Sequence, residues 1–444
     1  MANVALLASA VSAPTGLWPT IMNWIESSVV NYGWVIILFT LLIKACLSPL
    51  DLLLKFSTKK TTLVQQKLAP QIARINKRCG DDKQQAQMQT QALYKKEGFN
   101  VFGSCIVTLV NLVVTMVVFF TLFASLRQMS AYKAINQYAQ MEQAYVSTLQ
   151  VKTKENFINL INTNLDGTGK TYDSEYKTAF EGDGTEENKG YFYYLFSSEG
   201  LSEEVVNTLK TTVVYTSSEG VDVSLYSVLE TAENSAAVDA TNSASEVWKK
   251  VKDSWLWIGN IWVSDNYKSP LPSYSDLKSM ANSSKNKEYK AYVNSIDQKL
   301  YGVVTSSVHA QNSRWNGYYI LAVLSAGLTF LSQWLTELLQ KSKNKKVNDL
   351  VQQSNQQAGA MKFMKIFLPV MMVIFVLTSS ASFGLYIVSS SLISMLISTL
   401  TSLIVNACYK KKEEEIVATL EREAIRSMKK GKNGNVQTMN KYKR

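Results

Sequence analysis

The stretch IFLPVMMVIFVLTSSASFGLYIVSSSLISMLISTLTSLIVNACY, residues 366–409, decides the fold class, because its 44 positions contain no Asp, Glu, Lys or Arg. A helix that crosses a bilayer needs about 20 predominantly apolar residues. A single helix of this length would be about 66 Å long, roughly twice the thickness of the hydrocarbon layer. We therefore predict two spans joined by a reversal near Ser379–Gly384.

Further apolar runs lie on the N-terminal side of this stretch. Residues 98–126 and 315–336 contain no charged residue, and 31–50 contain Lys44 alone. A purely soluble protein is therefore excluded. Intrinsic disorder is excluded by the 46% hydrophobic content, and a secreted disulfide scaffold by the four Cys in 444 residues.

Charge assigns the segments between these runs to the two sides of a membrane. Segment 51–102 has ten basic and four acidic residues, 341–365 has six and one, and the tail 409–444 has eleven and five. Segment 129–316 instead has 17 basic and 23 acidic residues. Short basic loops stay on the cytoplasmic side. With five spans, all three basic segments face the cytoplasm, and the N-terminus and 129–316 lie outside.

The predicted fold class is an all-α polytopic membrane protein with five transmembrane helices, a cytoplasmic helical hairpin and a large extracytoplasmic insertion between spans two and three. In chain order, the predicted segments are an N-terminal extracytoplasmic or interfacial segment 1–30, transmembrane helix one 31–50, the cytoplasmic helical hairpin 51–102, transmembrane helix two 103–127, the insertion domain 128–316, transmembrane helix three 317–340, a cytoplasmic loop 341–362, transmembrane helix four 363–380, transmembrane helix five 384–408 and a basic cytoplasmic tail 409–444, part helical and part disordered.

The hairpin and the N-terminus carry local signals. Gly80 can end a helix in the left-handed conformation, and the residues after it, Asp81, Asp82 and Lys83, can begin the next one. Pro70 should kink or split the first hairpin helix, and Ser48-Pro49 should end span one. Residues 16–30 have the apolar spacing of an amphipathic helix at the outer interface. The stretch ending at Ala13 resembles a cleavage site without a basic segment before it, so cleavage stays open.

The insertion contains no recognised motif. The aromatic run Tyr191–Phe196 can seed a small core. Trp248, Trp255, Trp257 and Trp262 either form a second core or dock on the membrane surface. The segment contains no Cys, so we expect no disulfide in it.

Enzymatic chemistry has little support in this sequence. The single His309 cannot form a zinc site alone, and there is no Gly-rich phosphate loop. We therefore expect no catalytic residues, no metal and no cofactor.

The most informative residue is Lys44, which lies about 10 Å from the cytoplasmic end of span one. Its ammonium group can reach the headgroups by snorkelling, or it can face a polar cavity inside the bundle. Polar side chains spaced three and four residues apart on the other spans favour the cavity, although Ser and Thr also serve helix packing. The predicted groove residues are Lys44, Thr40, Thr108, Asn111, Thr115, Ser325, Thr329, Ser332, Tyr386, Ser390 and Ser394.

Several stretches resemble the YidC family of membrane protein insertases: FTLLIKACLSPL at 39–50, LAPQI at 68–72, GDDKQQAQMQTQALYKKEGFN at 80–100, GSCIVTLVN at 103–111, MKFMKIFLPVMMVIF at 361–375 and GLYIVSSSL at 384–392. The resemblance implies an insertase and chaperone in the bacterial plasma membrane, with nascent membrane proteins as substrates and a groove open to cytoplasm and lipid. It also implies a hairpin that recruits or releases substrate, a basic tail that can approach the ribosome, possible cooperation with the general translocation channel, and no small-molecule substrate.

The sequence departs from the family pattern at several points. Lys44 stands where bacterial members typically have Arg, Asn111 where many have Gln, and Val107 and Val113 where many have Pro. The long segment between spans two and three is also unusual for the family. A membrane sensor or transporter with an extracytoplasmic ligand-binding domain is the alternative. A specific small ligand of 129–316 would favour the sensor, and driven uptake of a solute would favour the transporter.

Overall fold

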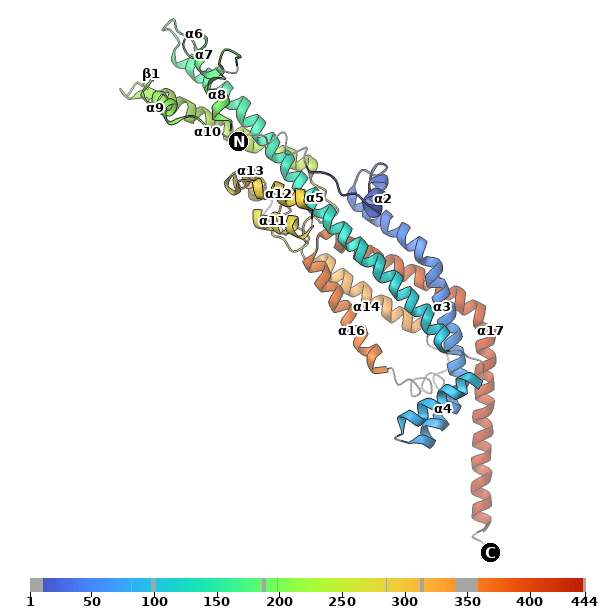
Figure 1. Cartoon of the computed structure of the whole chain (residues 1–444). Coiled ribbons are helices and arrows are strands. Elements are labelled where there is room, and N and C mark those ends of the chain that lie inside the picture. Colours follow the sequence, from blue (N-terminus) through green and yellow to red (C-terminus); the bar gives the residue numbers. More distant parts are fainter. Residues whose placement is uncertain are drawn as a thin grey trace. The chain divides into compact units, whose positions relative to one another are not determined.

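The computed structural model describes residues 11–80, 82–96, 101–185, 189–197, 199–284, 286–311, 315–340 and 358–441, and it is predominantly helical (Figure 1). Two compact units are present. The insertion unit comprises Met1–Gly33, Ala124–Tyr318 and Ser379–Ser382, and the bundle unit comprises Trp34–Phe123, Tyr319–Thr378 and Phe383–Arg444.

The helices and strands follow one another in the order α2 (Leu17–Glu26), α3 (Tyr32–Cys79), α4 (Lys83–Lys96), α5 (Val101–Asn164), α6 (Tyr172–Glu175), α7 (Lys177–Glu181), α8 (Gly190–Leu195), α9 (Glu203–Thr211), β1 (Val213–Thr216), β2 (Asp222–Ser224), α10 (Leu225–Val251), α11 (Tyr274–Ser283), α12 (Lys287–Ser295), α13 (Gln298–Gln311), α14 (Ile320–Gln340), α16 (Ala358–Thr378) and α17 (Ala381–Lys441). The antiparallel pair β1–β2 is a small departure from the all-α prediction.

Within the described residues, three helices are long and apolar enough to cross a membrane: α3, the Leu109–Asn164 part of α5 and the Ala381–Leu420 part of α17. Two shorter apolar helical stretches lie in α14 and α16. These findings agree with an all-α membrane protein, and the five-span arrangement stays a prediction. The reversal between the last two apolar helices lies where we predicted it, since α16 ends at Thr378 and α17 begins at Ala381.

The predicted end of helix at Ser48-Pro49 is wrong, because α3 runs without a break through Pro49 and Pro70 to Cys79. Proline lacks the N–H that would bond the carbonyl four residues earlier. For Pro49 that carbonyl belongs to Ala45, and the Ser48 hydroxyl donates to it at 2.9 Å. The neighbouring serine thus satisfies the acceptor that the proline leaves open, and Pro70 does not split the helix either.

Two other helices are longer than the sequence predicted. The second predicted span ends at 127, but α5 continues to Asn164. The tail, which we expected to be partly disordered, is helical to Lys441 as the end of α17. The predicted loop 341–362 lies largely outside the described residues, as do residues 1–10.

The predicted hairpin turn is present between α3 and α4. Gly80 has φ +55° and its N–H bonds the carbonyl of Asn76, which closes α3 in the left-handed conformation. Asp82 caps α4, because its Oδ1 accepts from the N–H of Gln85 at 2.9 Å. Asp81 and the side chain of Lys83 lie outside the described residues.

A first core of the insertion unit forms between α5, α10 and the helices α11 to α13. Helix α10 carries a ladder of buried alanines spaced four apart, which ends at the buried Trp248: Ala232, Ala236, Ala240 and Ala244. The last three alanines and Trp248 belong to this first core, and Ala232 belongs to the second core. Residues spaced by four lie on one helix face. A face of methyl groups allows the neighbouring elements to approach closely.

A second core of the insertion unit forms between the C-terminal end of α5 and the N-terminal end of α10. The predicted aromatic run supplies Phe192, whose ring lies 5.7 Å from that of Phe157. Phe180 stacks obliquely on Phe157 at 4.4 Å. The predicted aromatic run is therefore part of a core of the insertion unit.

The turn between α16 and α17 belongs to the insertion unit. The N–H groups of Ala381 and Ser382 donate to the carbonyl oxygens of Val263 and Ile261 at 2.8 and 2.6 Å. The Ser382 hydroxyl also lies 3.1 Å from that of Ser130, in α5. The turn is thus held by backbone and side-chain hydrogen bonds to the chain of the insertion.

Candidate functional site

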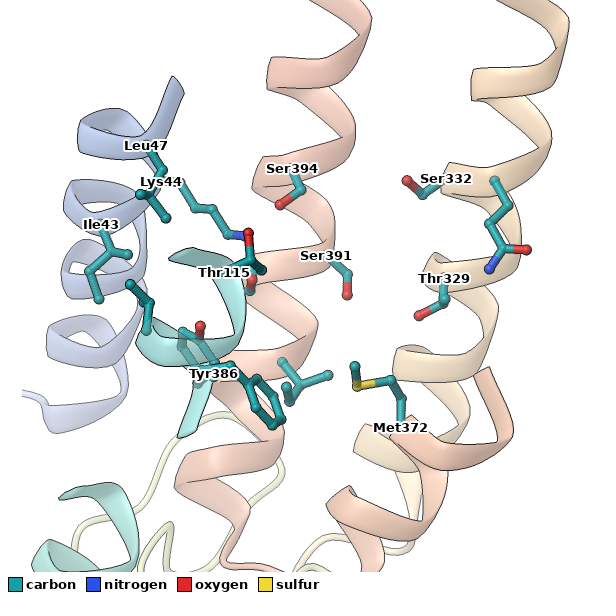
Figure 2. Close-up of a pocket in the computed structure, with 15 residues that line it drawn as sticks. Ile43, Lys44, Leu47, Thr115, Thr329, Ser332, Met372, Tyr386, Ser391 and Ser394 are labelled. Carbon is teal, nitrogen blue, oxygen red and sulfur yellow. The ribbon is translucent and has the colours of Figure 1, made fainter. Parts of the chain in front are cut away.

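A cavity of about 260 Å³ lies inside the bundle unit, between α3, α5, α14, α16 and α17 (Figure 2). It is lined by Ile43, Lys44, Leu47, Thr115, Val118, Phe119, Thr329, Ser332, Gln333, Met372, Tyr386, Ile387, Ser390, Ser391 and Ser394.

Helical periodicity explains how these side chains meet. On α5, Thr115 and Phe119 are four residues apart, and on α17 Tyr386, Ser390 and Ser394 repeat at the same spacing. Residues spaced three or four apart lie on one helix face. Figure 2 shows Lys44, Ser394 and Thr329 directed from their different helices into the same space.

The opposite faces of the same helices are apolar and exposed. Large apolar side chains that do not line the cavity and are open on the outside include Leu38, Leu41, Val113, Val117, Leu331, Trp334, Leu392, Leu396 and Leu400. In a soluble protein this arrangement would be reversed, with the apolar face inside. An apolar exterior around a polar interior is the arrangement that a surrounding lipid phase favours.

Lys44 is the only charged residue among the described residues that line the cavity. Its side chain is half-buried. Asp51, seven residues further along α3, interacts with it electrostatically but does not line the cavity. An ammonium group in this position offers three hydrogen-bond donors and a positive charge to whatever occupies the cavity.

The hydroxyl groups around Lys44 are partly engaged with their own helices. Thr329 donates its hydroxyl proton to the carbonyl of Ser325 at 2.7 Å. The Tyr386 hydroxyl shares a hydrogen bond with Ser390, one turn along α17. A hydroxyl that donates to the helix keeps its oxygen lone pairs, so the cavity wall presents acceptors beside the donors of Lys44 and the Gln333 amide.

An aromatic cluster adjoins the cavity at Phe119 and Tyr386. The ring of Phe123 lies 4.8 Å from that of Phe383 in an edge-to-face contact, and Phe119 lies 5.9 Å from Phe375. Phe383 is buried and its ring lies 6.0 Å from that of Tyr386. Aromatic side chains of the three helices α5, α16 and α17 therefore lie against one another beside the cavity.

Seven of the eleven predicted groove residues line this one cavity: Lys44, Thr115, Thr329, Ser332, Tyr386, Ser390 and Ser394. The prediction did not include Gln333, Ser391 or Met372. Ser391 follows Ser390 directly, so the polar face of α17 is wider than a single row of residues spaced by four.

Three of the other predicted residues do not line it, and the fourth cannot be placed. Thr40 is buried and its hydroxyl bonds the carbonyl of Ile36, and Ser325 is buried and bonds that of Ala322. Asn111 is half-exposed on α5 and does not line the cavity. The side chain of Thr108 lies outside the described residues.

No group of three or more His, Cys, Asp or Glu side chains within the described residues is arranged to hold a metal ion. His309 lies on α13, in the insertion unit and not at this cavity. The polar groups at the cavity are suited to hydrogen bonding and carry one positive charge.

Comparison with known proteins connects this bundle to a family. Residues 24–165, which include α3, the hairpin and α5, match the family model described as 60Kd inner membrane protein. The membrane protein insertase YidC of Thioalkalivibrio sulfidiphilus is 34% identical over 111 residues, 25% of this chain and 19% of the relative. That of Aromatoleum aromaticum is 31% identical over 111 residues, 25% of this chain and 20% of the relative.

The YidC of Laribacter hongkongensis is 34% identical over 118 residues, 26% of this chain and 21% of the relative. The chain thus aligns with about a fifth of the length of these curated relatives. No solved structure matches it. Lys44 and Thr115 lie within the region that matches the family model. The resemblance to the YidC family is confirmed, since residues 24–165 match the 60Kd inner membrane protein model and several relatives are named membrane protein insertase YidC.

Proposed function

We propose that this protein is a membrane protein insertase and chaperone, which receives polar segments of nascent membrane proteins in the cavity around Lys44 and releases their hydrophobic helices into the bilayer. The observation that carries the proposal is the cavity itself, whose wall combines one cation with several hydroxyl groups inside helices that are apolar outside. The match of residues 24–165 to the 60Kd inner membrane protein family model supports it.

The chemical argument rests on the cost of polar groups in hydrocarbon. A peptide group without a hydrogen-bond partner costs several kcal/mol there. The oxygen of Thr329 and the donors of Lys44 and Gln333 offer partners to such groups. A substrate segment in the cavity therefore avoids most of this cost while its apolar helix partitions into lipid.

The direction of entry follows from charge and packing. The basic segments on the N-terminal side of α5 and at the end of α17 keep that side of the bundle in the cytoplasm, with the N-terminus outside. The aromatic cluster at Phe119, Phe123 and Phe383 then lies toward the outer side and closes the cavity there. We propose that substrates enter from the cytoplasm and leave sideways into lipid, in the plasma membrane of a bacterium.

The proposed partners follow from the same topology. The hairpin of α3 and α4 faces the cytoplasm, where it can receive or release substrate. The tail at the end of α17 carries a net positive charge and can approach ribosomal RNA by electrostatic attraction. Cooperation with the general translocation channel is part of the proposal, and no small-molecule substrate or cofactor is.

Site-specific crosslinking tests the function directly. A photoreactive residue is placed at Ser394, which lines the cavity, or at Leu396, which is 55% exposed on the same helix. Ribosome-bound nascent chains of a small membrane protein are then added to inverted membrane vesicles. We expect crosslinks of the nascent chain's polar segment from position 394 and of its apolar helix alone from position 396.

A second matched pair repeats the test on another helix, with Thr115 at the cavity and Val117 exposed on the outside of α5. Failure of both cavity positions to crosslink, with folded protein and active ribosomes, would contradict the proposal. A protein that instead bound a solute through residues 129–316 would be a sensor or transporter.

A further inference from the structure

The loop after α10 exposes a short apolar tip, Trp255–Trp257, which we call the WLW tip. A bridge between Trp255 and Ile258 closes it into a tight turn. At its apex Leu256 is 70% exposed and has φ +49°, and Trp257 is 37% exposed. The left-handed region favours Gly or Asn, and a leucine there is uncommon. Neither burial nor backbone preference in this chain therefore accounts for leucine at the apex.

The tip is fastened to the residues that begin α3. The Asn31 side-chain amide donates to the carbonyl of Ser254 at 2.9 Å, directly before the tip. The indole of Trp255 packs against the backbone of Gly33 so closely that a Cβ at Gly33 would collide with it. In the sequence, Gly33 is followed by the apolar run 34–50, in which Lys44 is the only charged residue. The tip is thus held beside the point where the chain enters its first apolar helix.

Helix α2 exposes apolar residues in the same unit. Trp24 is 67% exposed, whereas Met22 and Ile25 on the other face are buried. Lys133 of α5 pairs with Glu26 at 3.0 Å and lies over the ring of Tyr32 at 4.6 Å, which fixes the link between α2 and α3 to the insertion.

A similar feature precedes the third apolar helix. Among the described residues, those other than glycine with positive φ are Leu256, Tyr318 and Tyr319. The two tyrosines are exposed and stand directly before α14. All three strained residues are therefore large, exposed and close to the start of an apolar helix.

We propose that the WLW tip inserts into the outer headgroup region of the bilayer and anchors the insertion unit to the membrane surface. Tryptophan prefers the boundary between headgroups and acyl chains, where its ring is apolar and its N–H can be hydrated. Fastening at Asn31 and Gly33 sets the tip at the depth where the first span begins. The exposed leucine at the apex would transfer its apolar surface from water into the acyl-chain boundary, which is favourable.

Spin labelling of the full-length protein tests this anchor. A nitroxide is attached at position 257, with the four native cysteines replaced, and the protein is reconstituted into phosphatidylcholine–phosphatidylglycerol vesicles. The control label replaces Val238, an apolar residue of α10 that is 62% exposed. We expect the ratio of oxygen to nickel-chelate accessibility to be severalfold higher at 257 than at 238. Equal, water-like ratios would overturn the proposal and favour a protein partner for the tip.

The substitution Leu256→Asn separates the anchor from the strain of the turn. Asparagine accepts positive φ, so the turn and the thermal stability in detergent should be kept or improved. In vesicles, the label at 257 should become more accessible to nickel chelate when Leu256→Asn is present. An unchanged accessibility ratio would show that Leu256 does not insert, independently of any insertase activity.

Discussion

The backbone N–H of Ser382 donates a hydrogen bond of 2.6 Å to the carbonyl oxygen of Ile261, 121 residues away in the chain. Ser382 is the second residue of the last apolar helix, α17, and Ile261 lies in the loop between α10 and α11. The pairing continues from Ala381 to Val263 at 2.8 Å. These two bonds therefore hold the turn between α16 and α17 within the insertion unit.

Removing the Ser382 N–H should destabilise the protein more than removing its hydroxyl. Ser382→Pro leaves the buried carbonyl of Ile261 without this donor, at a cost of about 1–3 kcal/mol, while proline is tolerated in a first helical turn. Ser382→Ala keeps the N–H and should cost about 1 kcal/mol. Thermal unfolding in detergent measures both.

The control for the proline is Glu204→Pro, at the second position of α9, where the side chain is exposed. We expect little change in the melting temperature for this variant. Equal losses for Ser382→Pro and Ser382→Ala would show that the backbone pairing contributes nothing measurable.

Lys44→Ala should reduce insertion of substrates with charged outer segments severalfold while the protein stays folded. The cavity then loses the only charge among its described lining residues, together with the three hydrogen-bond donors of the ammonium group. Insertion into proteoliposomes is scored by protease protection of the substrate. Lys60→Ala, at an exposed lysine of the same helix, should insert normally.

The variant Lys44→Arg tests whether insertion requires the positive charge alone or also the compact shape of the ammonium group. Arginine keeps the positive charge but presents a planar fork of donors on a longer side chain. We expect activity near that of the wild type. A loss as large as that of Lys44→Ala would mean that the compact ammonium group, and not the charge, is required.

Filling the cavity should also block insertion. Ser394→Leu removes a hydroxyl and places an apolar side chain into a space of about 260 Å³, so insertion should fall severalfold with little change in melting temperature. Leu396→Ile, on the exposed face of α17, is the matched control. Wild-type insertion by Ser394→Leu would exclude this cavity as the substrate path.

Acidification should destabilise the insertion unit through its single histidine. Burial lowers the pKa of His309 from its usual 6.5. A base whose pKa is lower when folded binds protons more tightly when unfolded. The stability is therefore complete above pH 6.5 and declines as the pH falls toward the lower, folded-state pKa. Melting temperatures between about pH 8 and pH 5 report this decline.

His309→Gln removes this proton linkage. The fall in melting temperature on acidification should be smaller than for the wild type, and the remainder then belongs to carboxylates. An identical pH profile would show that His309 titrates alike in the folded and unfolded states.

The apolar helices and much of the cavity were predictable from the sequence because they depend on composition and helical periodicity. Lys44, Thr115 and Ser394 each lie on a face that the spacing of polar residues identifies. Thr40 has the same spacing relative to Lys44, yet it is buried with its hydroxyl on the carbonyl of Ile36. Periodicity shows which residues share a face, but it does not show which part of that face another helix covers.

Helix ends were harder to predict. Pro49 indicated a helix end because it lacks a backbone N–H. The Ser48 hydroxyl instead donates to the carbonyl of Ala45, and this bond depends on one side-chain rotamer. The pairing of Ser382 with Ile261 joins residues far apart in the sequence, and no local pattern indicates it. Such long-range backbone contacts depend on tertiary packing, which a single sequence does not display.

The alanine ladder of α10 has a mechanical consequence. A buried methyl group loses no rotamer freedom on folding, so α10 packs closely in the first core without the entropic cost of ordering long side chains. The segment 129–316 also contains no cysteine. We therefore expect the packed helices α5 and α10 to be rigid. Because no disulfide can form in this segment, their rigidity should be the same under reducing and oxidising conditions.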